Sequence, residues 1–216
     1  MPSKRVNNPV IDLSEYDVVG EDGVMPSFVR HVGLSAASGS MAASGVSVHQ
    51  MGPPLNSSGT IKVDVFGTAD LDVGQKQRIK IFKDTHESEH LARKLGKRKG
   101  YVICPHVKDE QEEDGTRVFT RFSCVGFVIE AYKNAGIELL VLNAIPSIPI
   151  DQVCRAYPDI AEELKDHPKI RGRWGIEGDG PWPVALCGYV IHSLNRSVME
   201  IRKTAYSPQT SDAIFP

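Results

Sequence analysis

The chain lacks the features that would place it on nucleic acid or inside a membrane. Among its 216 residues, 25 are lysine or arginine and 27 are aspartate or glutamate, so the net charge is only −2 and no attraction to nucleic acid is expected. No apolar run is long enough to span a bilayer. The basic start, residues 1–17, has no apolar segment behind it, as a signal peptide would have. We therefore expect no nucleic-acid partner, no integral membrane segment and a cytoplasmic location.

Cysteine is scarce and widely spaced. The four cysteines, Cys104, Cys124, Cys154 and Cys187, form no C-x-x-C pair, which argues against a zinc knuckle. In a reducing compartment, the same spacing argues against structural disulfides.

The pattern of the chain predicts an α+β protein in three parts. Residues 1–22 are polar and are expected to be a loosely ordered lead-in, residues 23–145 a core domain, and residues 146–216 a C-terminal extension packed on that core. Alternation and apolar runs predict strands, and three-to-four spacing predicts helices. The expected strands are 28–34, 46–51, 60–66 and 78–82, and the expected helices begin at Thr85, at Cys124 and at Asp151, with Pro158 marking a bend or boundary in the last.

The segment 121–140 carries the strongest chemical signal. Its apolar residues recur every three or four positions, Gly136 stops the run, and Ser123 is a plausible N-cap, so Cys124 is expected in the first turn of an amphipathic helix. A thiol among the unpaired backbone N–H groups of a helix start is favoured as thiolate. Cys124 is therefore a candidate nucleophile, and the same N–H groups could hold an oxyanion. Because cysteine is often buried, Cys124 could instead be a core-packing residue, and the fold would then be an inactive binding module.

A nucleophilic thiol needs a histidine base and a polar group that orients the imidazole. Alternation places His31 on one face of the strand 28–34 and His49 on one face of the strand 46–51, so the two could meet across the hairpin. His106 and His192 are alternative bases.

These two stretches resemble a known family. RHVGLSAASGSMAASGVSVHQM and FSCVGFVIEAYKNAGIELL are similar to the base-bearing hairpin and the nucleophile helix of NlpC-type papain-like cysteine peptidases. Because the histidine precedes the cysteine, the order resembles the circularly permuted branch, which includes lecithin retinol acyltransferase-like proteins. The resemblance covers residues 25–140.

The resemblance implies a permuted papain-like fold, in which an antiparallel sheet packs against the helix that carries the cysteine. It implies Cys124 as nucleophile, His31 as general base and His49 as orienting group, and Tyr101 is similar to a substrate-binding tyrosine that precedes the cysteine. The implied activity is that of a cysteine hydrolase or acyltransferase on an amide or ester, with no cofactor. Ser123, Val125 and Leu34-Ser35 depart from the common residues of the family. The substrate therefore stays open among a peptide, a cell-wall fragment and an acyl-lipid.

A second motif competes for the chemistry. His86-Glu87-Ser88-Glu89-His90 has the H-E-x-x-H spacing, which on a helix places two imidazoles on one face where they could bind zinc, with Glu87 as general base. The third ligand would come from the acidic stretch, as Glu110 or Glu113. The surrounding charges instead favour a solvated helix with Leu91 and Leu95 turned inward. If the motif does bind zinc, the alternative function is that of a zinc metallopeptidase.

Overall fold

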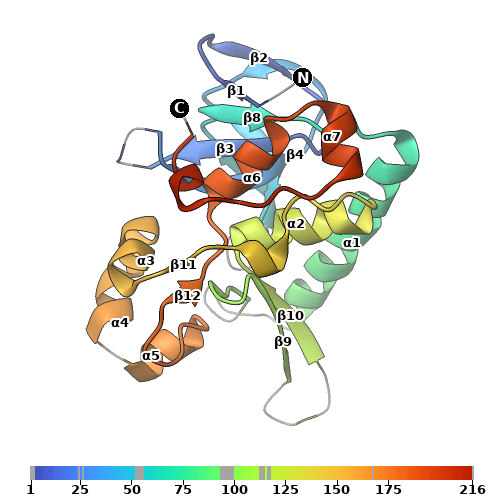
Figure 1. The fold of residues 1–216 in the computed structure, drawn as a ribbon. Helices are drawn as coiled ribbons and strands as arrows, with labels where there is room; N and C mark the ends of the chain where they lie inside the picture. The colour runs from blue at the N-terminus through green and yellow to red at the C-terminus, as the bar shows by residue number, and fades with distance from the viewer. Residues whose placement is uncertain are drawn as a thin grey trace.

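An antiparallel six-stranded sheet forms the upper part of the molecule in the computed structural model (Figure 1). The structure describes residues 3–23, 25, 27–51, 56–92, 100–111, 115, 118–166 and 168–215. The strand order is β1-β8-β3-β4-β6-β7. The strands are β1 Lys4–Arg5, β3 Val18–Asp22, β4 Val29–Ser35, β6 Val46–Gln50, β7 Asn56–Ile61 and β8 Val65–Gly67.

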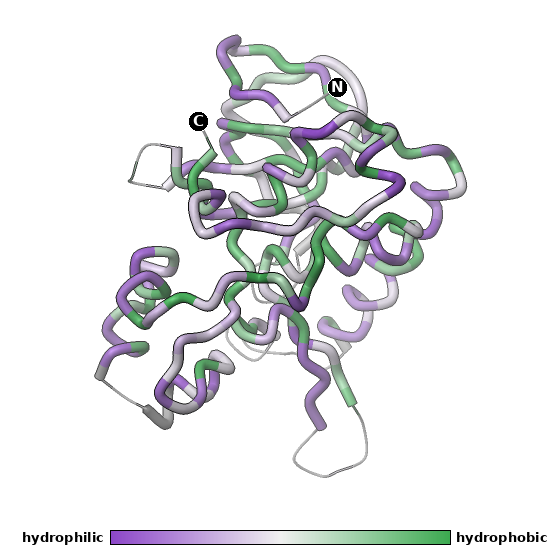
Figure 2. Tube along the Cα trace, in the orientation of Figure 1, coloured by the Kyte–Doolittle hydropathy of each residue, from purple (hydrophilic) through white to green (hydrophobic). Residues whose placement is uncertain are grey.

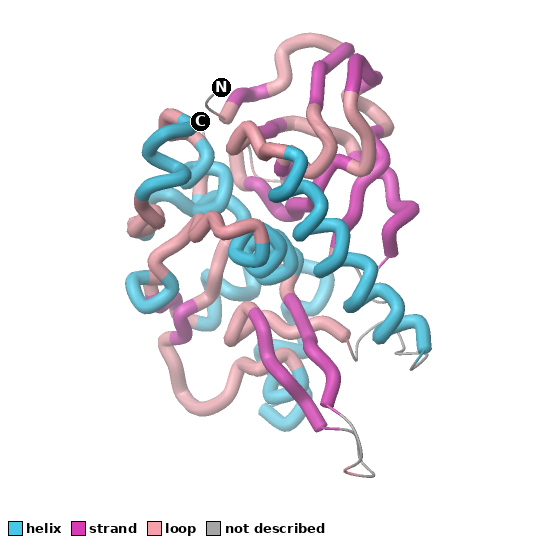
Figure 3. Tube along the Cα trace, turned by 90° about the vertical axis from the view of Figure 1, so that its right-hand side faces the viewer, coloured by secondary structure: helices cyan, strands magenta, loops and turns pink. Residues whose placement is uncertain are grey.

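Three two-stranded ribbons complete the β-structure of the described residues. They are β2 Val10–Leu13 with β5 Gly39–Ala42, β9 Val107–Gln111 with β10 Val118–Phe122, and β11 Ser147–Ile148 with β12 Trp182–Pro183. Figure 3 shows the β9–β10 hairpin extending away from the six-stranded sheet. β10 leads directly into the Cys124 helix, so this hairpin determines where that helix begins.

The helices pack against the sheet and form an arm beside it. They are α1 Val73–Ala92, α2 Cys124–Asn134, α3 Ile150–Ala156, α4 Ala161–Asp166, α5 Pro168–Arg173, α6 Cys187–Leu194 and α7 Val198–Lys203, with short 3-10 turns at Leu142–Ala144, Pro158–Ile160 and Thr210–Ala213. α2 contacts β4, β6, α1 and α6, whereas α4 contacts both α3 and α5, and these three helices form the arm in Figure 1. The expected bend at Pro158 is present, because α3 ends before it and α4 begins after it.

The main hydrophobic core lies where the sheet, α1, α2 and α6 meet. Apolar side chains of β4, α2 and α6, among them Val32, Val128 and Val190, are completely buried in one cluster. Figure 2 shows the hydrophobic segments gathered at this junction. The mixed α+β class expected from the sequence is observed, with antiparallel sheets.

Both ends of the chain are more integrated than the sequence indicates. Residues 4–22, within the expected loose lead-in, supply β1, β2 and β3, and β3 pairs with β4 and β8 inside the sheet. At the other end, α6 is part of the main core, and Ser3 Oγ donates to the Ile191 carbonyl at 2.7 Å. The first and last segments of the chain therefore both belong to the folded core.

Helix α1 corrects the expected strand at 78–82. The Arg-Ile-Lys-Ile-Phe alternation lies inside a helix that begins at Val73, because Asp72 and Gln75 form reciprocal side-chain-to-backbone bonds of 2.8 and 3.0 Å at its start. Ile79 is buried and Ile81 is 56% exposed, as helical spacing requires. Leu91, expected to point inward, is 60% exposed, and Leu95 lies outside the described residues.

Candidate active site

The start of α2 is built as the sequence predicts. Ser123 is the N-cap, and its Oγ accepts the backbone N–H of Gly126 at 2.8 Å. Cys124 is the first helical residue and is 2% exposed. The His106 carbonyl accepts the Ser123 N–H at 2.9 Å, and a Cβ at position 126 would lie 1.8 Å from that carbonyl oxygen. Gly126 therefore allows the chain before β9 to hold the first turn in place.

His31 on β4 lies beside the nucleophile candidate. α2 packs on β4, and the Cys124 sulfur interacts with the His31 imidazole. The other side of the ring is held by Gln50, because His31 Nε2–H donates to Gln50 Oε1 at 2.6 Å. With Nε2 engaged, Nδ1 is the nitrogen left for the sulfur. The structure thus brings the predicted pair Cys124 and His31 together.

Gln50 makes the contact that the sequence assigned to His49. Leu34 on β4 pairs with His49 on β6, so His49 belongs to the position opposite Leu34, and the neighbouring Gln50 shares the face of Gly33 and His31. The β6–β7 register also shifts between Val48 and Gln50. The His49 ring packs 5.8 Å from the Tyr16 ring, and its Nδ1 has no hydrogen-bond partner among the described residues.

Two glycines provide the space in which the Gln50 amide lies. A Cβ at position 33 would come 3.3 Å from Gln50 Cβ, and a Cβ at position 59 on β7 would come 2.1 Å from Gln50 Nε2. Both values are below an ordinary van der Waals contact. The glycines at these two positions therefore leave room for the Gln50 side chain, which orients His31.

Tyr101 reaches the same sulfur from the segment before β9. Its hydroxyl lies 3.6 Å from Cys124 Sγ and accepts the Cys124 backbone N–H at 3.4 Å. Arg121 fixes this segment, because its guanidinium donates to the Tyr101 carbonyl at 2.5 Å and pairs with Glu110 at 2.5 Å. The hydroxyl thus lies beside both the Cys124 sulfur and the first backbone N–H of α2, where a hydrogen-bond donor could stabilise charge that develops next to the sulfur.

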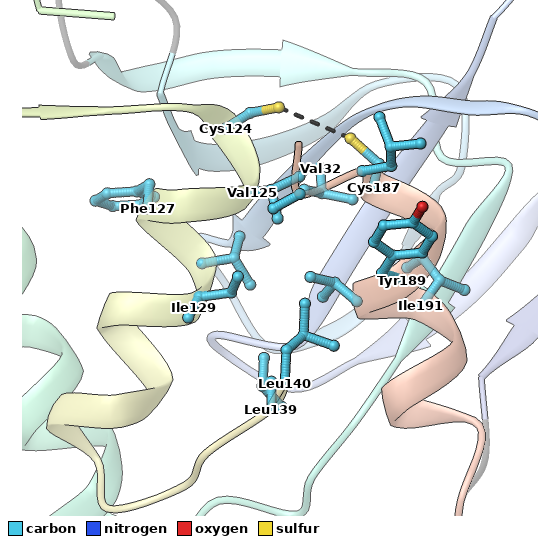
Figure 4. Packing of buried hydrophobic residues seen from close by; sticks show 14 of the residues in the cluster. Val32, Cys124, Val125, Phe127, Ile129, Leu139, Leu140, Cys187, Tyr189 and Ile191 are labelled. Carbon is cyan, nitrogen blue, oxygen red and sulfur yellow. Dashed lines mark hydrogen bonds between the residues drawn. The ribbon is translucent and has the colours of Figure 1, made fainter. Parts of the chain in front are cut away.

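Cys187, which the sequence did not single out, is the sulfur neighbour of Cys124. The two Sγ atoms lie 3.8 Å apart, and Figure 4 shows them pointing toward each other from the first turns of α2 and α6. Cys187 is 6% exposed. Its place in the sequence, 63 residues after Cys124, gives no sign of this contact.

These neighbours set the ionisation of the site. Hydrogen bonding from the Cys187 thiol holds the pKa of Cys124 well below that of an ordinary thiol, and His31 and Tyr101 add to this effect against the opposing effect of burial. Burial lowers the pKa of His31, but the interaction with Cys124 and the bond to Gln50 outweigh it, and the net shift is upward. Burial raises the pKa of Tyr101 well above its ordinary value, so the hydroxyl stays protonated as a donor. The lowered pKa of Cys124 and the raised pKa of His31 together favour a thiolate–imidazolium pair.

The alternative bases have other partners. His106 Nε2 lies 3.5 Å from Glu130 on α2, and this imidazole helps to hold the pKa of Glu130 below its usual value. His192 Nε2–H donates to the Ile214 carbonyl at 2.8 Å, with its ring against Phe215. The main contributions to the lowered pKa of Cys124 come instead from Cys187, His31 and Tyr101.

The H-E-x-x-H motif lies on the inner face of α1. His86 packs edge-on against Phe82 and Phe122 at 4.7 and 4.9 Å between ring centroids. His90 is completely buried, and its Nε2–H donates to the Thr120 carbonyl at 2.9 Å. Glu110 pairs with Arg121, and Glu113 lies outside the described residues. Within the described ranges, no group of three histidine, cysteine or acidic side chains is placed to hold a metal ion.

Comparison with known proteins gives no relative. No protein-family model matches the chain, and neither a curated protein nor a solved structure matches it significantly. None of the described helices combines the length and apolar character needed to cross a bilayer. The functional argument therefore depends on the geometry around Cys124.

Proposed function

We propose that this protein is a cysteine-dependent hydrolase or acyltransferase that acts on an amide or an ester. The observation that carries the proposal is the arrangement at the start of α2, where Cys124 meets His31 and His31 is held by Gln50 at 2.6 Å. The resemblance of both segments to the circularly permuted NlpC-type branch of the papain-like fold is part of the same proposal. Gln50 takes the orienting role that the resemblance had suggested for His49.

The first half of the reaction forms a thioester. The Cys124 thiolate attacks the carbonyl carbon, and the carbonyl π electrons move to oxygen. The Cys124 N–H and the Tyr101 hydroxyl, which lie 3.4 Å apart, stabilise the oxyanion. When the tetrahedral intermediate collapses, the bond to the leaving group breaks, and the His31 imidazolium gives its proton to the departing amine or alkoxide.

The second half returns the enzyme to its starting state. Neutral His31 removes a proton from water, or from another acceptor, which attacks the thioester carbon and expels the Cys124 thiolate. Gln50 acts as a positioning residue, since it contacts the imidazole rather than the substrate. Cys124 is covered, whereas His31, Gln50 and Tyr101 are partly exposed, so we expect substrate to approach Cys124 from the side of these three residues.

The direct test is hydrolysis of a panel of activated esters and peptide anilides by purified wild type and Cys124→Ala. The wild type is expected to hydrolyse at least one member, and Cys124→Ala to lose at least roughly a thousandfold in kcat/KM. Cys154→Ser is the matched control, because Cys154 is also buried and its thiol only contacts the Ala161 carbonyl, at 3.6 Å.

The same preparation separates an enzyme from an inactive papain-like module. Iodoacetamide is expected to label Cys124 rapidly near neutral pH, because the thiolate is the reactive form. Retention of full activity in Cys124→Ala would overturn the proposed nucleophile. Slow labelling of Cys124 without turnover of any panel member would favour a binding module.

A further inference from the structure

A second thiol stands closer to the proposed nucleophile than the chemistry of acyl transfer requires. Cys124 and Cys187 are the first residues of two helices that pack side by side, and their sulfurs are 3.8 Å apart (Figure 4). The proposed reaction uses one thiol, one imidazole and one oxyanion site. Cys187 therefore has no assigned role beyond a hydrogen bond.

Rigid backbone holds each of the two thiols. The α2 start is fixed by the His106 carbonyl against Gly126. The α6 start is fixed in the same way, because a Cβ at Gly188 would lie 2.3 Å from the Asp212 carbonyl oxygen. The sulfur contact thus belongs to two anchored helix starts.

The other two cysteines show what an ordinary buried thiol looks like here. Cys104 Sγ lies 3.6 Å from the Pro183 carbonyl and Cys154 Sγ lies 3.6 Å from the Ala161 carbonyl, without a sulfur neighbour. Burial raises the pKa of both thiols, whereas at Cys124 the hydrogen-bond partners outweigh burial and the net shift of the pKa is downward. Only one of the four cysteines combines ionisation with a second thiol in contact.

We propose that Cys124 and Cys187 are a redox modification site, in which hydroperoxides oxidise Cys124 and Cys187 resolves the product as a reversible disulfide. A disulfide needs the sulfurs at about 2.05 Å, so the two Sγ atoms, now 3.8 Å apart, have to approach each other by less than about 2 Å. This inference goes beyond the proposed function, and only its effect on activity depends on that function.

The reaction balances in two steps. The Cys124 thiolate attacks one peroxide oxygen and the O–O bond breaks; the sulfur becomes a sulfenic acid and the second oxygen leaves as hydroxide (or alkoxide) that takes up a proton. The Cys187 sulfur then attacks the Cys124 sulfur, the S–O bond breaks, and the hydroxide leaves as water with the Cys187 proton. A dithiol reductant reverses the disulfide.

The order of the two steps follows from the charges. The thiolate of Cys124 and burial together raise the pKa of Cys187, so Cys187 stays protonated while Cys124 reacts with peroxide. The sulfenic acid is neutral, and the negative charge that opposed ionisation of Cys187 is gone. Cys187 can then ionise and attack.

Tryptic mapping tests this directly, because each cysteine falls on its own peptide. Cleavage after arginine and lysine places Cys104 in 100–108, Cys124 in 122–133, Cys154 in 134–155 and Cys187 in 174–196. Brief treatment of the full chain with hydrogen peroxide, followed by alkylation and digestion without reductant, is expected to yield 122–133 linked to 174–196. Peptides 100–108 and 134–155 are expected to remain alkylated.

Cys187→Ser is the decisive variant, since a hydroxyl can still donate to Cys124 but cannot form a disulfide. Under the same treatment, peptide 122–133 of this variant is expected to proceed to sulfinic acid that dithiothreitol does not reverse, whereas the wild type recovers its free thiols. Cys154→Ser is expected to behave like the wild type.

The outcomes separate the two proposals. If the linked peptide forms but no panel substrate is turned over, the redox site stands and the hydrolase proposal fails. If peroxide carries wild-type Cys124 to sulfinic acid without a linked peptide, or leaves both thiols reduced, the redox site is overturned whatever the activity.

Discussion

The β4–β6 hairpin and helix α1 both carry histidines near the start of α2, yet they use them in opposite ways. On the hairpin, the His31 imidazole interacts with the Cys124 sulfur and bonds the Gln50 amide through Nε2. On α1, His86 and His90 lie among phenylalanine rings, and His90 bonds a backbone carbonyl. The same side chain is thus a candidate for chemistry in one region and part of the core in the other, and the neighbours decide which.

The largest expected effect is on turnover. His31→Ala removes the group that accepts and returns the proton, so kcat/KM is expected to fall by at least roughly a thousandfold. His86→Ala removes an imidazole that packs against aromatic rings and contacts Glu89 at 3.2 Å, away from the Cys124 sulfur, and it is expected to keep activity within about tenfold. Steady-state kinetics on the substrate found with the panel measure both. Equal losses in the two variants would remove the distinction between the regions.

The second effect concerns the orientation of the imidazole. Gln50→Ala leaves His31 Nε2 without its acceptor, and the misplaced ring is expected to cost on the order of a hundredfold in kcat. His49→Ala is the matched control on the neighbouring residue, and a change of less than about tenfold is expected. Rescue by Gln50→Glu, which keeps an acceptor oxygen, would support the positioning role. A larger loss in His49→Ala than in Gln50→Ala would restore the assignment made from the sequence.

The position of Gln50 shows what the sequence could and could not predict. The local signals at the start of α2 were sufficient, because the N-cap, the first-turn cysteine and the glycine stop all lie within 14 residues of Ser123. Strand alternation correctly grouped His31 with Gly33. It could not give the register between strands, and a slip of one residue exchanges His49 for Gln50.

Long-range contacts were also beyond the sequence. Cys187 meets Cys124 only because α6 returns to the core, and no local pattern in 184–197 specifies where that helix packs. The strands of residues 4–22 escaped prediction for a related reason, since short strands such as β1 and β3 are stabilised by their partner strands rather than by their own composition. On α1, the Arg-Ile-Lys alternation imitated a strand, while the Asp72–Gln75 cap and the buried Ile79 and Phe82 decide for a helix.

A third effect distinguishes the regions by stability. His90→Ala leaves a cavity in the core and removes the bond to Thr120, so the free energy of unfolding is expected to fall by about 1–3 kcal/mol. For a chain of this length, that corresponds to a drop of roughly 2–12 °C in Tm. His31→Ala is expected to change Tm less. Urea unfolding and thermal scans of both variants measure the contrast, and a His90→Ala protein as stable as the wild type would contradict it.

A smaller effect is expected from a residue that touches neither the thiol nor the imidazole. Gly59→Ala places a Cβ where the Gln50 amide now lies, 2.1 Å from Nε2, so the amide must move. We expect about a tenfold loss in kcat with little change in KM, because the positioning of His31 is affected and substrate contacts are not. Gly45→Ala is the control, because a Cβ there has open space around it, and its activity is expected to equal that of the wild type. Gly136→Ala would not serve, because the positive φ of Gly136 would strain any other residue. Equal activity of Gly59→Ala and the wild type would separate Gln50 from catalysis.

The smallest effect concerns the pH dependence of Cys124 labelling. In His31→Ala, the maximal labelling rate is expected to stay nearly unchanged, and only the pH at which labelling rises is expected to shift. The lowered pKa of Cys124 places the rise of iodoacetamide labelling below the pH at which an ordinary thiol, with a pKa of about 8.5, ionises. The His31 imidazolium stabilises the thiolate, so His31→Ala raises the pKa of Cys124 and shifts this rise to higher pH. In the wild type, the raised pKa of His31 keeps the ion pair intact to higher pH before the imidazolium is lost. His86→Ala is expected to reproduce the wild-type curve. If the His31→Ala curve coincided with the wild-type curve, the low pKa of Cys124 would come from the helix starts and Tyr101, with no contribution from His31.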